Sequence, residues 1–66
     1  VRFPANASAI KEGIGSERMW VKITDGDNLN GVGILENEPN YSDFKLHQRV
    51  KFEESEDGFP QFKEFA

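Results

Sequence analysis

The sequence Glu17-Arg-Met-Trp-Val-Lys-Ile-Thr24, with Asp25-Gly-Asp-Asn28 and Gly31-Val-Gly-Ile-Leu35 after it, decides the fold class. Residues 18–24 alternate in polarity and are rich in β-branched and aromatic side chains, which predicts a strand. The Asp, Gly and Asn residues that follow tolerate a positive φ, as tight turns require. Residues 29–36 then return as a second strand. The stretch therefore predicts a β-hairpin that carries the single tryptophan of the chain.

The position of the turn sets which residues face each other across this hairpin. A turn centred on residues 26 and 27 places Val21 opposite Val32 and Trp20 opposite Gly33, and a turn one residue earlier places Trp20 opposite Gly31. Both registers bring the same faces together, because a shift of two residues preserves the pleat. In either one the indole covers a glycine, so we expect a structural role for Trp20 ahead of a functional one. The core-facing residues of the first strand are then Met19, Val21 and Ile23.

Residues 48–54 predict a third strand, with Val50 and Phe52 facing the core. The preceding residues 37–43 are predicted to form a loop, because Pro39 cannot donate to a sheet ladder and its neighbours favour turns. Leu46 is expected to plug the core beneath the sheet.

The two ends of the chain carry weaker patterns. Residues 8–13 favour a single helical turn, with Asn6 or Ser8 as its N-cap and with Phe3 and Ile10 as its anchors. The phenylalanines of residues 59–65 recur every third position, which suits either a last helical turn or an extended tail that closes the core.

The length of 66 residues predicts a single domain spanning residues 1–66. The chain has no cysteine, so neither a disulfide nor a thiolate metal site stabilises it. The sequence therefore predicts a mainly β fold: a small twisted antiparallel sheet with a short helical turn at one or both ends. A partly open SH3-like or OB-like barrel is one form that such a sheet takes.

The acidic charge is concentrated in the second half of the chain. The net charge is −4; residues 1–33 sum to zero, whereas residues 34–66 hold four basic and eight acidic side chains. A nucleic-acid binder needs a positive patch for counterion release, so this distribution argues against a nucleic-acid partner. It also argues against an anionic membrane surface, and no apolar run reaches the ~18 residues of a membrane span. The default compartment is cytoplasmic.

No motif indicates catalysis, a cofactor or a metal. The spacing from Asp25 to Glu36 resembles a calcium loop, but Leu29 and Asn30 stand where that loop needs an oxygen ligand and a glycine. His47 is the only histidine and lacks both the further ligands of a zinc site and a partner for acid–base chemistry. We therefore expect the protein not to be an enzyme.

Two surfaces are candidates for binding. The first is a sheet face, on which an exposed aromatic side chain beside a cation could contact a protein. The second is an acidic run, which at a strand end more often protects the edge than binds a ligand. The predicted face consists of Trp20, Lys22, Leu35 and Tyr41, and the acidic patch consists of Glu53, Glu54, Glu56 and Asp57.

Three segments carry a resemblance to a known family. Residues 17–24, Gly33-Ile-Leu-Glu-Asn-Glu-Pro39 and Leu46-His-Gln-Arg-Val-Lys-Phe52 are similar to the motifs of the YegJ-like family of uncharacterised bacterial domains. The likeness covers residues 17–52. Where the third motif of the family has Gly-Asp, this chain has Gln48-Arg49. The resemblance implies a bacterial or phage setting and a small β fold, and it transfers no catalytic residue.

We therefore expect a small non-enzymatic module that binds another protein of unknown identity through the sheet face or an exposed edge strand. An acidic inhibitor or immunity-type protein that caps a basic partner such as a nuclease is the alternative. A single-stranded nucleic-acid binder of the small-barrel type is the second alternative, disfavoured by charge.

Overall fold

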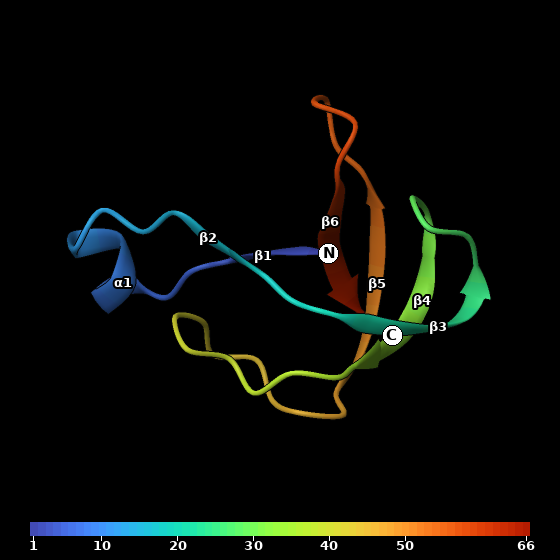
Figure 1. Ribbon diagram of the computed structural model, residues 1–66, viewed down its shortest axis with the longest axis horizontal. Helices are drawn as coiled ribbons and strands as arrows, with labels where there is room; N and C mark the ends of the chain where they lie inside the picture. The colour runs from blue at the N-terminus through green and yellow to red at the C-terminus, as the bar shows by residue number, and fades with distance from the viewer.

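The computed structural model describes all 66 residues as one six-stranded sheet with a single short helix (Figure 1). The strand order is β2-β1-β6-β5-β4-β3, with every neighbouring pair antiparallel except β1 and β6, which are parallel. The predicted mainly β fold is confirmed. The sheet is open and does not close into a barrel. The elements are β1 (Arg2–Pro4), α1 (Ala7–Lys11), β2 (Ser16–Arg18), β3 (Val21–Gly26), β4 (Gly31–Leu35), β5 (Arg49–Glu54) and β6 (Pro60–Phe65).

The two edge strands, β2 and β3, are consecutive in the chain and are separated only by Met19 and Trp20. Met19 exchanges two backbone hydrogen bonds with Val1 (2.9 and 3.0 Å), whereas the carbonyl of Trp20 accepts one from Glu36 (2.9 Å). The chain therefore changes its pairing partner from the β1 side to the β4 side between these two residues. Figure 1 shows the resulting continuous path across the molecule. The strand predicted at residues 18–24 is thus two strands, and the sheet curls so that its edges approach each other here.

The turn of the β3–β4 hairpin lies two residues later than predicted. Gly26 and Gly31 form its last pair, and residues 27–30 form the loop. The carboxylate of Asp27 accepts a hydrogen bond from the Asn30 backbone N–H (2.8 Å), which fixes this longer loop. A bulge at Thr24 then changes the pairing by one residue along β3.

As a result, the register shifts by three residues and the two faces of β4 are exchanged. Val21 faces Leu35 instead of Val32. An odd shift moves every side chain of a strand to the opposite face, so Leu35 and Gly33 point into the core. The prediction that Trp20 covers a glycine is wrong, because Val21 lies over Gly33 instead.

The core lies on one face of the curled sheet and includes the fully buried side chains of Phe3, Leu35 and Val50. Phe44, from the loop between β4 and β5, packs its ring 4.8 Å from that of Phe3. Leu46 is 40% exposed, so the predicted plug is wrong and Phe44 fills that role. The prediction that Val50 and Phe52 of the third strand face the core is confirmed by their burial.

The helical turn predicted near the N-terminus is α1, whose N-cap Asn6 accepts a hydrogen bond from the N–H of Ala9 (2.9 Å). Ala9 is its buried residue, and the predicted anchor Ile10 is 57% exposed. At the other end, residues 60–65 form the strand β6, so of the two predicted alternatives the extended segment is confirmed and the helical turn is wrong. Pairing with both β5 and β1 satisfies the backbone of this segment, and its Phe62 packs against the core.

Candidate functional site

Trp20 is 79% exposed, the largest exposed fraction among the large hydrophobic side chains that lie open to solvent. Its backbone is nevertheless held firmly: the N–H donates to Oδ1 of Asn37, and the carbonyl accepts from Glu36. Because the preceding Met19 points into the core, Trp20 and Arg18 both point to the outer face. The backbone of Trp20 is thus held in place, whereas its indole ring is exposed to solvent.

The indole borders a hollow of about 290 Å³ at the junction of the two sheet edges. Four of its five lining residues are hydrophobic, and the fifth is a cation. Its volume is sufficient for one large side chain of a partner. The lining residues are Val1, Arg18, Met19, Trp20 and Phe59.

Phe59 forms one wall of this hollow, and two guanidinium groups lie against its ring. The carbons at the centres of the Arg2 and Arg18 guanidinium groups are 5.6 and 5.9 Å from the ring centroid, within cation–π range. Arg2 also forms an ion pair with Asp57. Arg18 has no carboxylate within ion-pair distance. The hollow therefore combines apolar side chains with the guanidinium group of Arg18, which forms no ion pair.

Lys22 continues the same outer face along the chain. It lies opposite Ile34, which lies opposite Arg49 on the next strand, so the three side chains share that face. Neither Lys22 nor Arg49 forms an ion pair. In the continuous segment from β2 to β3, every second side chain thus points outward. These side chains are the cation Arg18, the aromatic Trp20 and the cation Lys22.

The other two residues of the predicted face lie elsewhere. Leu35 is fully buried and cannot contact a partner, because the shifted register turned it into the core. Tyr41 is 44% exposed but lies in the loop between β4 and β5, where its carbonyl accepts a hydrogen bond from Asn6 (2.7 Å). Tyr41 does not line the hollow beside Trp20.

Sequence reasoning missed Arg18 and Phe59 as members of this site. The spacing of Arg18, two residues before Trp20, was a readable signal, because alternate residues of a strand share a face. Phe59 had no such signal. It reaches the hollow only because β6 returns beside β1, a parallel pairing that the sequence pattern does not reveal.

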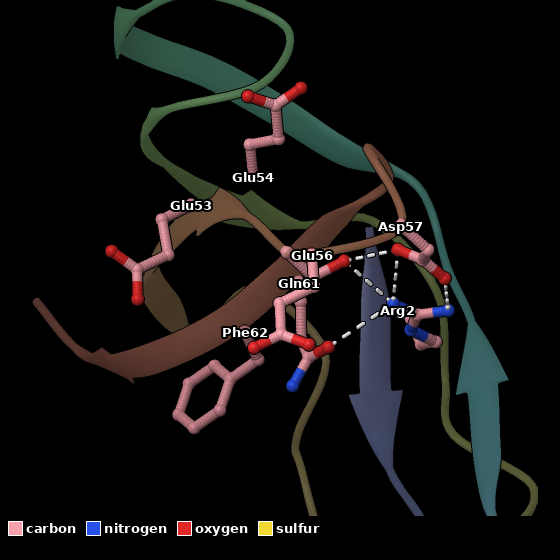
Figure 2. A pocket seen from close by; sticks show the side chains of 8 residues that line it. Arg2, Glu53, Glu54, Glu56, Asp57, Gln61 and Phe62 are labelled. Carbon is pink, nitrogen blue, oxygen red and sulfur yellow. Dashed lines mark hydrogen bonds and ion pairs between the residues drawn. The ribbon is translucent and has the colours of Figure 1, made fainter.

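The predicted acidic patch lines a separate concavity of about 590 Å³ around the β5–β6 turn (Figure 2). Asp57 forms a two-pronged ion pair with Arg2 (2.8 and 3.0 Å), and Glu53 pairs with Lys63 (3.4 Å). Hydrogen bonds from Arg2, from the Ser55 hydroxyl and from the Phe59 N–H hold the pKa of Asp57 well below its usual range. Asp57 therefore fastens the β5–β6 turn to Arg2 of β1.

Glu54 and Glu56 are the members of the acidic patch that form no ion pair. Figure 2 shows Glu53 and Glu54 pointing away from the Arg2 cluster. With two of its four carboxylates compensated by Arg2 and Lys63, the patch offers a basic partner about half of the charge that its sequence suggests.

Asp27 and His47, the remaining candidates from the sequence, form hydrogen bonds with backbone groups and shape two turns. The carboxylate of Asp27 accepts hydrogen bonds from Asn30 and Leu29, which lower its pKa and close the hairpin loop. His47 has a φ of 67° and its N–H donates to the carbonyl of Leu35 (2.8 Å), so it forms the turn into β5.

No group of three or more His, Cys, Asp or Glu side chains is placed to hold a metal ion. No helix of the protein has the length and apolar character needed to span a bilayer.

Comparisons with protein-family models, with curated proteins and with solved structures found no match to this chain. The resemblance of residues 17–52 to the YegJ-like domains therefore stays a prediction. Two residues of those motifs have structural roles. The carboxylate of Glu17 accepts hydrogen bonds from the backbone N–H groups of Asn40 (2.8 Å) and Tyr41 (3.0 Å), and Asn37 accepts one from Trp20.

Proposed function

We propose that this protein is a non-enzymatic protein-binding module and that its contact surface is the outer face around Trp20. The observation that carries the proposal is an indole that is 79% exposed, anchored through its backbone and set beside the uncompensated Arg18. Tryptophan and arginine are the residue types most enriched at the energetic centres of protein interfaces. A large exposed aromatic ring next to an apolar hollow is a surface that gains free energy when a partner covers it.

The chemistry of the hollow supports binding over catalysis. The side chains that line it are two aromatic rings, a valine, a methionine and an arginine, none of which is a common general acid, general base or nucleophile. The bacterial or phage setting that the YegJ-like resemblance implies is part of the proposal and adds no residue role.

The outer face around Trp20 suits a binding function better than the acidic patch does. An acidic inhibitor of a basic enzyme needs several free carboxylates on one face, and Arg2 and Lys63 compensate two of the four in this patch. Glu54 and Glu56 remain for that alternative, so a paired substitution of these two residues separates the two functions.

The test is affinity capture from a lysate of the source organism with the immobilised protein, followed by quantitative mass spectrometry. We expect at least one protein to be captured by the wild type and by Ile10→Ala, which removes another exposed hydrophobic side chain, on α1, but not by Trp20→Ala. Capture that depends on Glu54→Gln plus Glu56→Gln and falls steeply with salt would favour the inhibitor function instead. Capture that no Trp20 substitution changes would contradict the proposal.

A further inference from the structure

The outer face of β3, β4 and β5 carries three side chains that lie directly beside one another. Lys22 of β3 faces Ile34 of β4, and Ile34 in turn faces Arg49 of β5. Side chains that face each other across neighbouring strands have Cβ atoms about 4.5–5.5 Å apart. These three residues form the cationic row, in which an aliphatic side chain stands between an ammonium and a guanidinium group.

The two cations of the row form no ion pair within the chain. Lys51, the next outward cation of β5, differs from them because its Nζ lies 4.0 Å from a carboxylate oxygen of Glu64. Ile34 is half-buried although it lies on the face opposite the core. The aliphatic stems of lysine and arginine cover neighbouring apolar surface in this way while their charged ends stay in water. The row therefore offers a partner two free charges with an apolar centre between them.

The spacing of the row fits an α-helix that lies across the strands. Neighbouring strands are about 4.8 Å apart, so the backbone positions of Lys22 and Arg49, two strands apart, are separated by roughly 9–10 Å. Residues i and i+7 of an α-helix share a face and are about 10.5 Å apart, with residues i+3 and i+4 between them. In an extended segment, residues on one face are about 6.6 or 13 Å apart, and neither spacing matches the row.

We propose that the cationic row binds an acidic amphipathic helix of the partner protein. The helix lies across β3, β4 and β5, with one carboxylate against Lys22, a second against Arg49 and an apolar side chain over Ile34. The contact uses side chains of the sheet face and none of the backbone at the edge of β3. Trp20, two residues before Lys22 on the same face, meets the flank of the helix. The inference rests on the proposed function and names the class of partner, because complementary charges select a partner while buried aromatic contacts supply affinity.

Two other occupants fit the row less well. Carboxylates lie on both sides of it: Glu36 next to Trp20, whose carbonyl accepts its N–H, and Glu64 beside Lys51. An oligonucleotide carries a charge at every phosphate, so it would approach both carboxylates as well as a chain of net charge −4. A second copy of the row, laid face to face, would bring cations against cations, which repel. A helix carries carboxylates only where its own sequence places them.

The test uses fluorescence anisotropy with a labelled, capped helical peptide, rich in alanine and glutamine, that carries glutamate at i and i+7 and leucine at i+3 and i+4. A second peptide of the same composition has its later glutamate two residues further on, which turns that side chain to the other side of the helix. We expect the wild type to bind the first peptide about threefold or more tightly than the second, as loss of one partly exposed ion pair implies. Added salt should weaken the binding of the first peptide.

A charge exchange on the protein tests the same contact. Lys22→Glu plus Arg49→Glu should weaken binding of the first peptide about tenfold or more and should favour a peptide with lysine in place of both glutamates. Lys11→Glu plus Lys45→Glu is the matched control, because it makes the same change in net charge with two cations that form no ion pair. Lys11 belongs to α1, at the other end of the molecule from β3 (Figure 1), and Lys45 to the loop before β5. We expect the control to change binding about twofold or less, and circular dichroism establishes that each variant is folded.

The inference is overturned if the wild type binds neither peptide or binds both equally, or if the two pairs of substitutions weaken binding alike, as net charge alone would cause. Binding of an oligothymidine that is tighter than that of the first peptide, and that Lys22→Glu plus Arg49→Glu abolishes, would also overturn it. If lysate capture still depends on Trp20 in any of these cases, the helix contact fails while the proposed function stands. Lysate capture that does not depend on Trp20 contradicts the proposed function itself.

Discussion

Gly33 is the position at which the shifted register of the hairpin can be tested most sharply. A methyl group built on Gly33 would lie 2.5 Å from the carbonyl oxygen of Lys22 and closer still to Cγ1 of Val21. Ordinary contacts between such atoms begin near ~3.5 Å, so β3 would have to move away by about 1 Å. The Lys22 carbonyl cannot rotate aside, because it is part of the backbone of β3.

Gly33→Ala should therefore destabilise the protein by about 2–4 kcal/mol, the range typical of severe overpacking. A domain of this size has a total free energy of unfolding of roughly 3–10 kcal/mol, so the variant would lose a large share of it. With a urea dependence of about 1 kcal/mol per molar, the unfolding midpoint should fall by roughly 2–4 M.

Far-UV circular dichroism is the suitable readout, because Trp20 is exposed in the folded protein and its emission should change little on unfolding. Gly15→Ala is the matched control, since a methyl group there meets no atom within 4 Å. In the register expected from the sequence, Gly33 lies under the indole and an added methyl group would be tolerated or buried. A Gly33→Ala midpoint equal to those of the wild type and Gly15→Ala would refute the observed register.

Two further predictions concern the contacts that fasten the loops. The pKa of Asp57 is lowered by Arg2, so this carboxylate contributes stability above its unfolded pKa of ~3.9 and loses it as the pH falls through the lower folded value. Urea titrations of the wild type and Asp57→Asn should therefore differ at neutral pH and converge in strong acid; a constant difference would contradict this. Glu17→Gln removes a charged acceptor of the Asn40 and Tyr41 amides, and hydrogen exchange at these two amides should accelerate about tenfold while that at Val50 changes less. Equal acceleration at all three would show global destabilisation instead.

The sequence was sufficient to predict the elements whose residues alternate clearly. The third strand, with Val50 and Phe52 inward, needs only a period of two. The cap at Asn6 needs only local hydrogen bonding to Ala9. The hairpin itself also followed from its turn chemistry.

The register, the strand order and half of the predicted site did not follow from the sequence. The Asp27 carboxylate fixed a longer loop, the bulge at Thr24 altered the pairing, and together they moved Leu35 from the expected binding face to the core. Neither the longer loop nor the bulge can be predicted from the alternation of polar and apolar residues. Phe59 reached the site through the parallel pairing of β1 and β6, which joins the two ends of the chain.

The acidic patch shows how charge patterns can mislead. Its run of carboxylates is visible in the sequence, but the ion pair between Asp57 and Arg2 joins residues far apart along the chain. A charge run can be evaluated as a binding surface only when its long-range partners are known.

The central claim is that Trp20 is available to a partner because it has no role in the folded core. The measurement that tests it most directly compares Trp20→Ala with the wild type in urea unfolding and in partner capture. We predict a change of about 0.5 kcal/mol or less in the free energy of unfolding, as for a surface substitution, together with loss of capture. A loss of about 2 kcal/mol or more, with capture retained by the folded fraction, would place the indole in the structure of the sheet and contradict the account.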